Sequence, residues 1–165
     1  MRKPLAFIAA AALAALWTLT FQAIYGAHAL PARIPTHFDG SGNVNGWGEP
    51  RMLWLFPIIA TVVFALMALV SRYPESFNYP MRVTPLTRPR LQAITLGMIA
   101  WLRFEIVGLF LWIQFEIVRS ARRGHNTLPP FLLLMTIGVV FATILAHFVA
   151  MGRAAGQMPA APRIR

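Results

Sequence analysis

From Met52 to Ser71 the sequence reads MLWLFPIIATVVFALMALVS, 20 residues without a charged side chain. A helix needs about 20 mainly apolar residues to cross a hydrocarbon core of about 30 Å. The stretch meets this requirement, and Pro57 lies near its start, where a helix within a bundle tolerates proline. We therefore expect residues 52–71 to form a membrane-spanning helix.

Three more stretches approach the same length and apolar character. The first follows Arg2 and Lys3, and the last carries no formal charge. Basic residues beside an apolar run are typical of the ends of transmembrane helices. The sequence therefore predicts an all-α integral membrane protein with four transmembrane helices and an ordered outer loop between the first two. The three additional spans are expected at Leu5–Tyr25, Leu91–Val118 and Leu128–Met151.

The composition fits a protein whose solvent is lipid. Of the 165 residues, 58% are hydrophobic and 12% are charged, and the mean hydropathy is +0.60, whereas soluble domains carry about 25% charged residues. The net charge of +10 could indicate nucleic-acid binding. The basic residues lie beside the apolar runs, however, so we expect contact with the lipid bilayer and no nucleic-acid partner. The absence of cysteine excludes disulfides and thiolate metal sites.

The first apolar stretch has a second interpretation. Its basic start and the small-x-small sequence Ala27-His28-Ala29 are typical of a signal peptide with a cleavage site. Its apolar region is longer than the roughly 7 to 15 residues of a signal-peptide core. We therefore favour a retained helix, with cleavage as the alternative.

The distribution of basic residues predicts the orientation. Four spans place both termini on one side of the membrane, and cytoplasmic segments carry an excess of Lys and Arg. With both termini in the cytoplasm of a bacterial cell, the inner segments of this plasma (inner) membrane protein carry nine basic residues and the outer segments five. Three of the five, Arg119, Arg122 and Arg123, oppose the rule locally. The nine are Arg2, Lys3, Arg72, Arg82, Arg88, Arg90, Arg153, Arg163 and Arg165, and the five are Arg33, Arg51, Arg119, Arg122 and Arg123.

The loop between the first two spans contains the segment Leu30–Gly48, which reads LPARIPTHFDGSGNVNGWG. Its two prolines favour an extended first half, whereas the Gly, Asn, Asp and Ser cluster that follows favours turns with positive φ. The loop is therefore expected to be ordered. Trp47, close to the start of the second span, is well placed to lie at the membrane interface.

His37 and Asp39 raise the question of a metal or acid–base site, because side chains two apart leave an extended strand on the same side. A metal site needs several protein ligands, and Glu49 is the only further acidic or histidine residue close by. We favour side chains that bond within their own loop. The series from Asp39 to Gly46 lacks the glycine phase and the closing glutamate of an EF-hand. No metal and no cofactor is therefore expected.

The string Leu-Pro-x-x-Ile-Pro-x-His-Phe-x-x-x-Gly-x-x-x-Gly-Trp-Gly, met from Leu30 to Gly48, closely resembles the signature of a bacterial membrane domain of unknown function. That domain also forms the N-terminal module of the membrane proteins that give immunity to the sporulation-delaying protein, a secreted peptide toxin. The resemblance implies an extracytoplasmic loop, a plasma-membrane location and protection against a toxic substance. The candidate loop residues for contact with a ligand or partner, a peptide toxin or a membrane regulator, are Pro31, Ile34, Pro35, His37, Phe38, Asp39, Gly42, Gly46 and Trp47.

The resemblance also divides the chain. Residues 1–75 correspond to the immunity-like module, and residues 76–151 form a second helical pair with no comparable signature. The better-known immunity proteins carry further C-terminal helices beyond this module. Residues 152–165, rich in Ala, Pro and Arg, are expected to form a disordered basic tail near anionic lipid.

The third span contains an eleven-residue echo, in which WLRFEIV at residues 101–107 recurs as WIQFEIV at residues 112–118. At about 100° per residue, eleven residues make nearly three turns, so each repeated residue returns to the same face. Two stripes on roughly opposite faces result. One consists of Gly97, Trp101, Glu105, Gly108, Trp112 and Glu116, and the other of Gln92, Arg103 and Gln114.

Arg103, Glu105 and Glu116 are the candidate intramembrane polar residues. A charge near the bilayer centre costs about 2.5 to 3.5 kcal/mol on insertion scales, so Arg103 and Glu105 should face protein or water. They lie about 200° apart around the helix and cannot easily pair. We therefore expect a central helix with neighbours on both faces, a second copy of the chain in a homo-oligomer being one such neighbour. Glu116 is expected to face Arg119 and Arg123.

Three function classes follow. The favoured one is a multi-pass plasma membrane protein of the toxin-immunity type. The first alternative is a small transporter or a subunit that translocates protons or solutes, because Glu105 in a low-dielectric site could carry or sense a proton, although a structural ion pair or hydrogen-bond network is the plainer role. The second alternative is an envelope assembly or structural protein. An enzyme is not expected, because no catalytic triad, metal-ligand cluster or phosphate-binding loop is visible.

Overall fold

The structure is a computed structural model that describes residues 2–28, 30–124 and 130–156. Within these ranges four helical segments are long and apolar enough to cross a membrane: Lys3–Tyr25, Pro50–Val70, Arg88–Arg123 and Leu134–Gly156. The predicted four-helix fold class is therefore confirmed. In chain order the elements are α1 (Arg2–Tyr25), β1 (Ile34–Phe38), β2 (Val44–Gly48), η1 (Pro50–Trp54), α2 (Leu55–Val70), η2 (Pro74–Ser76), α3 (Arg88–Arg123) and α4 (Pro130–Gly156).

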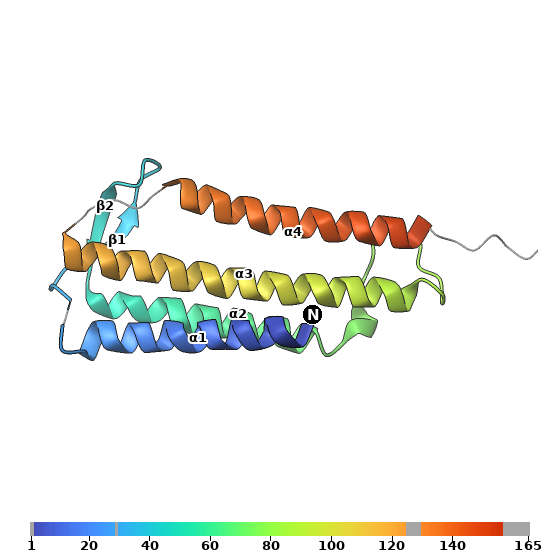
Figure 1. The fold of residues 1–165 in the computed structure, drawn as a ribbon, viewed down its shortest axis with the longest axis horizontal. Helices are drawn as coiled ribbons and strands as arrows, with labels where there is room; N and C mark the ends of the chain where they lie inside the picture. Colours follow the sequence, from blue (N-terminus) through green and yellow to red (C-terminus); the bar gives the residue numbers. More distant parts are fainter. Residues whose placement is uncertain (1, 29, 125–129, 157–165) are drawn as a thin grey trace, which may run out of the picture.

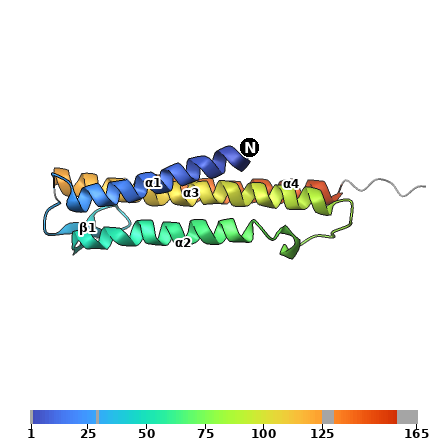
Figure 2. The same ribbon diagram turned by 90° about the horizontal axis from the view of Figure 1, so that it is seen from below.

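The four α-helices lie side by side along one long axis (Figures 1 and 2). α1 and α3 run in one direction, and α2 and α4 run in the other. The two strands lie at the end where α1 and α3 finish and α2 begins, and we call this the hairpin end. α3 contacts α1, α2, α4 and β1, so the prediction that the third helix is central, with neighbours on both faces, is confirmed.

α3 is longer than the span predicted for it. Its 36 residues give a length of about 54 Å at 1.5 Å per residue, well beyond a hydrocarbon core of about 30 Å. The predicted bounds of 91 and 118 excluded the flanking arginines, but the helix continues through them at both ends. It stops at Gly124, whose φ of +67° forms a left-handed C-cap.

The start of α2 and the end of α4 also differ from the sequence prediction. The second span begins with the 3₁₀ turn η1, and α2 starts only at Leu55. Pro57 then falls in the first turn of α2, where a missing N–H costs nothing. α4 continues to Gly156, so residues 152–156 are helical and the predicted disordered tail does not begin at 152. Residues 157–165 lie outside the described residues.

α1 packs on α3 through one narrow stripe. The buried residues along α1 are Leu5, Ala9, Leu16, Thr20 and Ala23, whose spacings of three, four and seven return to one helical face. The two alanines allow the backbones to approach closely, as is usual between transmembrane helices.

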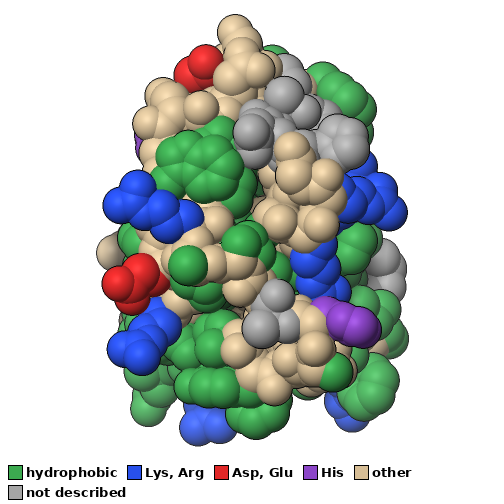
Figure 3. Space-filling model, turned by 90° about the vertical axis from the view of Figure 1, so that its left-hand side faces the viewer, with side chains coloured by type: hydrophobic (Ala, Val, Ile, Leu, Met, Phe, Trp, Pro, Cys, Tyr) green, Lys and Arg blue, Asp and Glu red, His purple; other side chains and the backbone are tan. Residues whose placement is uncertain are grey.

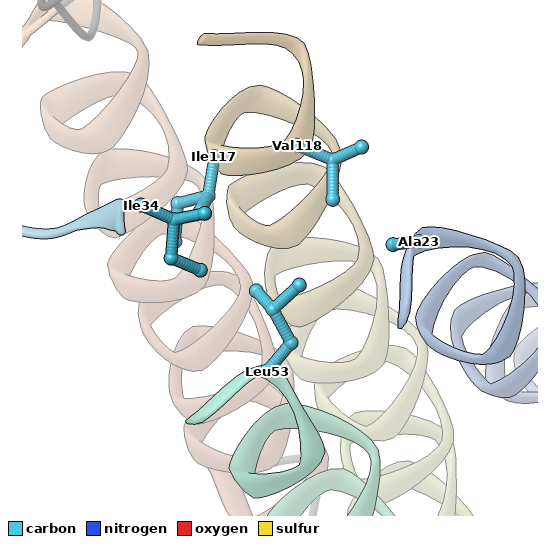
Figure 4. Close-up of a cluster of buried hydrophobic side chains, with 5 residues drawn as sticks. All are labelled: Ala23, Ile34, Leu53, Ile117 and Val118. Atoms are coloured by element: carbon cyan, nitrogen blue, oxygen red, sulfur yellow. The ribbon is translucent and has the colours of Figure 1, made fainter. Parts of the chain in front are cut away.

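One of two buried hydrophobic clusters lies at the hairpin end, and the other, Leu91, Met151 and Ala154, lies at the opposite end. Ala23 of α1, Ile34 of β1, Leu53 of η1, and Ile117 and Val118 of α3 form a buried cluster (Figure 4). Because the cluster draws on four elements, it fixes the β-hairpin to the ends of three helices.

The outer faces of the helices are apolar rather than polar. On α4 the side chains of Phe131, Leu134, Phe141 and Leu145 are each more than 60% exposed. Continuous exposed apolar surface of this kind is unfavourable in water and is the surface expected of a helix in lipid. The chain is therefore a multi-pass membrane protein.

Candidate functional site

The segment with the signature string forms a β-hairpin. β1 pairs antiparallel with β2, with Ile34 opposite Gly48 and Phe38 opposite Val44. The register is irregular on either side of His37. The extended first half was predicted, whereas the pairing with a second strand was not.

Asp39 organises the tip of the hairpin. Its Oδ1 accepts hydrogen bonds from the backbone N–H groups of Ser41 and Asn43, each 2.9 Å long, in the manner of an Asx turn. Gly42 between them has a φ of +85°. The predicted positive-φ turn and the predicted bonding of Asp39 within its own loop are both confirmed.

His37 bonds to a side chain of the opposite strand. Its Nδ1 forms a hydrogen bond with the Oδ1 of Asn45, and its ring is exposed. Among the described residues, no group of three or more His, Cys, Asp or Glu side chains could hold a metal ion. His37 and Asp39 therefore each have a partner within the hairpin and do not converge on a common site.

Burial divides the residues of the signature string into two groups. Ile34 and Pro35 are fully buried, Gly42 is buried, and Phe38 packs against the core cluster. Ile34, Pro35 and Phe38 dock the hairpin on the helices, whereas Gly42 lies in the turn at its tip. Gly46 is partly buried in the strand pair. The exposed candidates for contact with a partner are Pro31, His37, Asp39 and Trp47.

The exposed residues belong to a mixed surface at the hairpin end. Figure 3 looks at this end and shows basic, acidic and histidine side chains among hydrophobic ones. Trp47 is 48% exposed. A partly exposed Trp beside polar groups is typical of protein–protein interfaces, in which a few Trp, Tyr and Arg side chains supply most of the binding energy.

An apolar cavity lies beneath the hairpin. It has a volume of about 230 Å³ and is bounded by β1, η1, α2 and α3. Its walls include Ile34, Pro35, Phe56 and Phe110, so the same strand that carries His37 outward forms the roof of the cavity.

Gly46 is required by the close approach of the two strands. A Cβ added at Gly46 would lie 2.8 Å from the Cβ of His37, whereas one added at Gly40 would meet no atom within 4 Å. We expect Gly46→Ala to destabilise the hairpin by about 1–3 kcal/mol and Gly40→Ala to have little effect. Hydrogen exchange of the strand amides in detergent-solubilised protein measures the difference. Equal protection in the two variants would contradict the pairing described.

Arg103 lies on the α2 side of α3. Its guanidinium carbon is 4.9 Å from the centroid of the Phe64 ring, a cation–π contact. Its Nε is buried without a hydrogen-bond partner. The prediction that Arg103 faces protein is confirmed, although the partner is an aromatic ring rather than a carboxylate.

Glu105 lies on the α4 side of α3. The hydroxyl of Thr143 donates a 2.5 Å hydrogen bond to Oε1, while Oε2 is buried without a partner. One turn along α4, the Nδ1 of His147 donates to the carbonyl of Thr143 at 2.7 Å, and His147 lines a cavity with Gly97. Arg103 and Glu105 therefore face different helices and do not pair, as their spacing predicted.

Gln114 and Glu116 of α3 also have side-chain partners, although Oε1 of Gln114 is buried without one. Nε2 of Gln114 donates a 2.5 Å hydrogen bond to the Thr20 hydroxyl of α1, in a fully buried position. Glu116 forms a 3.2 Å ion pair with Arg119, one of the two arginines that it was predicted to face. Sequence reasoning missed Asn45, Phe64, Thr143 and Thr20 as partners. Nothing in the local spacing could have found them, because each lies on a different element from the residue it contacts.

One comparison with known proteins gives a match. Residues 5–61 match a family described as a domain of unknown function (DUF1648). The match begins in α1, includes the hairpin and η1, and ends within α2. This supports the resemblance to a domain of unknown function but carries no information on toxin immunity. No curated protein and no solved structure matches the chain.

Proposed function

We propose that this protein protects its cell against a secreted peptide toxin and that the hairpin end recognises the toxin. The observation that carries the proposal is the construction of the hairpin. Buried residues fix it to the helix bundle, while His37 and Trp47 stay exposed. A rigid element that presents exposed side chains loses little conformational entropy on binding. No catalytic step is part of this proposal.

The chemistry of the hairpin end suits an amphipathic peptide. The hairpin end exposes polar side chains such as Asp39 and His37 on the hairpin and apolar ones such as Met52 and Leu55 on η1 and α2. Met52 and Leu55 also line the cavity beneath β1. A peptide with one polar and one apolar face could therefore contact the polar and the apolar side chains together.

We further propose that the hairpin end faces outward from a bacterial plasma membrane. Of the described charged residues, the opposite end carries one acidic residue, Glu75, and seven basic ones, Arg2, Lys3, Arg72, Arg82, Arg88, Arg90 and Arg153. The hairpin end carries five arginines, and three acidic residues, Asp39, Glu49 and Glu116, offset them in part. The excess of basic residues favours a cytoplasmic location for the opposite end and for both termini.

A growth test measures the proposed protection. The deletion strain is challenged with a panel of secreted antimicrobial peptides and complemented with the wild type, Trp47→Ala or Tyr73→Ala. Tyr73 is 60% exposed but precedes η2 at the opposite end, so it controls for loss of an exposed aromatic. We expect Trp47→Ala to lose protection, since removal of a Trp hot spot costs about 2 kcal/mol or more, roughly 30-fold in affinity. Full protection by Trp47→Ala, or no sensitivity of the deletion strain to any peptide, would refute the proposal.

A second candidate function is the translocation of protons or a solute through a site that uses Glu105. The unpartnered Oε2 in the middle of α3 favours this candidate, because buried polar atoms normally have partners and those without one often have a functional role. An envelope assembly role remains the third possibility, and no single contact favours it.

A further inference from the structure

We infer that the α3–α4 interface contains a binding site for a small lipophilic organic cation, such as an aromatic quaternary ammonium ion, at Glu105. The inference deepens the second candidate function and rests on the same carboxyl group. It concerns binding, which is measurable whether or not transport follows.

The first argument is the charge of the interface. Glu105 is the eighteenth of the 36 residues of α3, far from both ends of the helix, and its Oε2 is buried with no hydrogen-bond partner. Arg103 cannot neutralise it because that side chain lies over Phe64 of α2. His147 uses its Nδ1 on the backbone of its own helix. Among the residues that the structure describes, the carboxyl group therefore has no cationic partner, and a negative charge on it would be uncompensated.

The second argument is the cavity that Glu105 lines. It has a volume of about 190 Å³ and lies between α3 and α4. An apolar cavity of about 150 Å³ is large enough to hold benzene, so a ring with a small ammonium group fits the space. The rim residues Met135 and Val139 are about half exposed, which leaves the cavity open toward the surrounding lipid.

The third argument is the chemistry of the walls. Phe104 and Trp112 line the cavity together with Glu105 and Met135. Aromatic faces attract cations, most strongly where water is excluded, and they are the usual surroundings of quaternary ammonium groups. A carboxylate supplies the opposite charge. Aromatic rings, a thioether and one carboxylate favour a cation with an apolar body over an anion, a sugar or a hydrated metal ion.

The eleven-residue echo explains how the cavity forms. Gly108 and Trp112 line the cavity at Glu105, and their echo partners Gly97 and Trp101 line a second cavity of about 480 Å³ along the same interface. In each case the glycine leaves space because it has no side chain, and the Trp one turn later forms a wall of the cavity. The second cavity contains His147 and no carboxylate, so it serves as an internal control.

Binding can be tested on the full-length protein in lipid nanodiscs, by calorimetry with phenyltrimethylammonium as the probe. The neutral isostere tert-butylbenzene has the same shape without the charge. We expect the cation to bind wild type at least tenfold more tightly than it binds Glu105→Gln, and Trp112→Leu to weaken binding severalfold. Trp101→Leu, in the second cavity, should bind as wild type does.

Several outcomes would overturn the inference. These are no binding of the cation to wild type, equal affinity for the cation and the isostere, or unchanged affinity in Glu105→Gln. If Glu105→Gln does not fold, the comparison of cation with isostere on wild type and the pair Trp112→Leu and Trp101→Leu still decide the question. Binding without any cation flux in proteoliposomes would retain the site but reject the second candidate function.

Discussion

Ile34→Ala should lower the stability of the protein by about 2–5 kcal/mol, the range for truncating a fully buried aliphatic side chain. Ile34 has no exposed surface and lies at the centre of the cluster that joins β1 to η1, α1 and α3. Truncation leaves a cavity against Leu53 of η1 and Ile117 of α3, whose backbones belong to separate elements (Figure 4). Such a cavity is difficult to close by relaxation.

Thermal unfolding of detergent-solubilised protein measures this effect. For a chain of this size, 1 kcal/mol corresponds to about 2–4 °C, so the midpoint should fall by roughly 4–20 °C. Arg33→Ala is the matched control, because Arg33 is the preceding residue and is exposed. If both variants unfold at the same temperature, the hairpin is not fixed to the bundle in the way described.

The same variant connects stability to the proposed function. In Ile34→Ala the exposed residues His37 and Trp47 are unchanged, but β1, which carries His37 and pairs with the strand of Trp47, loses its main anchor. If recognition of the toxin depends on a rigid hairpin, it should weaken when the hairpin is no longer fixed to the helix bundle. Trp47→Ala, in contrast, removes a contact residue without removing the anchor.

The spans could be predicted because the bilayer imposes a length and an apolar composition that are visible in one dimension. The predicted ends of α3 and α4 were less accurate, for one physical reason. The sequence suggests that spans end at the flanking arginines, but a helix can continue beyond the membrane through residues with good helix propensity, and Arg is one of them. α3 continues through Arg119, Arg122 and Arg123 to its glycine cap, and α4 continues through Arg153.

The hairpin could be predicted only in part. The prolines indicated extended backbone in β1, and the Gly and Asn residues indicated the turn. β2 reads VNGWG, a sequence whose two glycines conceal the alternation that marks a strand. Its pairing depends on contact with β1, including the space that Gly46 leaves for His37. Local strand propensity gives no information about long-range contacts of this kind.

The polar positions of α3 show a similar division. Helical periodicity correctly separated Arg103 from Glu105 and predicted neighbours on both faces. It could not identify Phe64 or Thr143, because the choice of partner depends on which helix packs on which face. The cavities beside Gly97 and Gly108 likewise exist only once α4 lies on α3.

The second prediction with a large expected effect concerns the membrane topology. The protein is well suited to a topology measurement. The native chain contains no cysteine, so a single introduced cysteine reacts without background. Ser41 at the tip of the hairpin and Asn78 between η2 and α3 are both exposed. They lie at opposite ends of the bundle, separated by the length of α2 (Figure 1).

The most direct test of the account is the reaction of Ser41→Cys and Asn78→Cys with a membrane-impermeant maleimide, in intact spheroplasts and after permeabilisation. The account predicts near-complete labelling of Ser41→Cys in intact spheroplasts and labelling of Asn78→Cys only after permeabilisation. Equal labelling of both positions in intact spheroplasts would contradict a membrane between the two ends. Labelling of Asn78→Cys alone would contradict an outward-facing hairpin, and with it the proposed recognition of a secreted toxin.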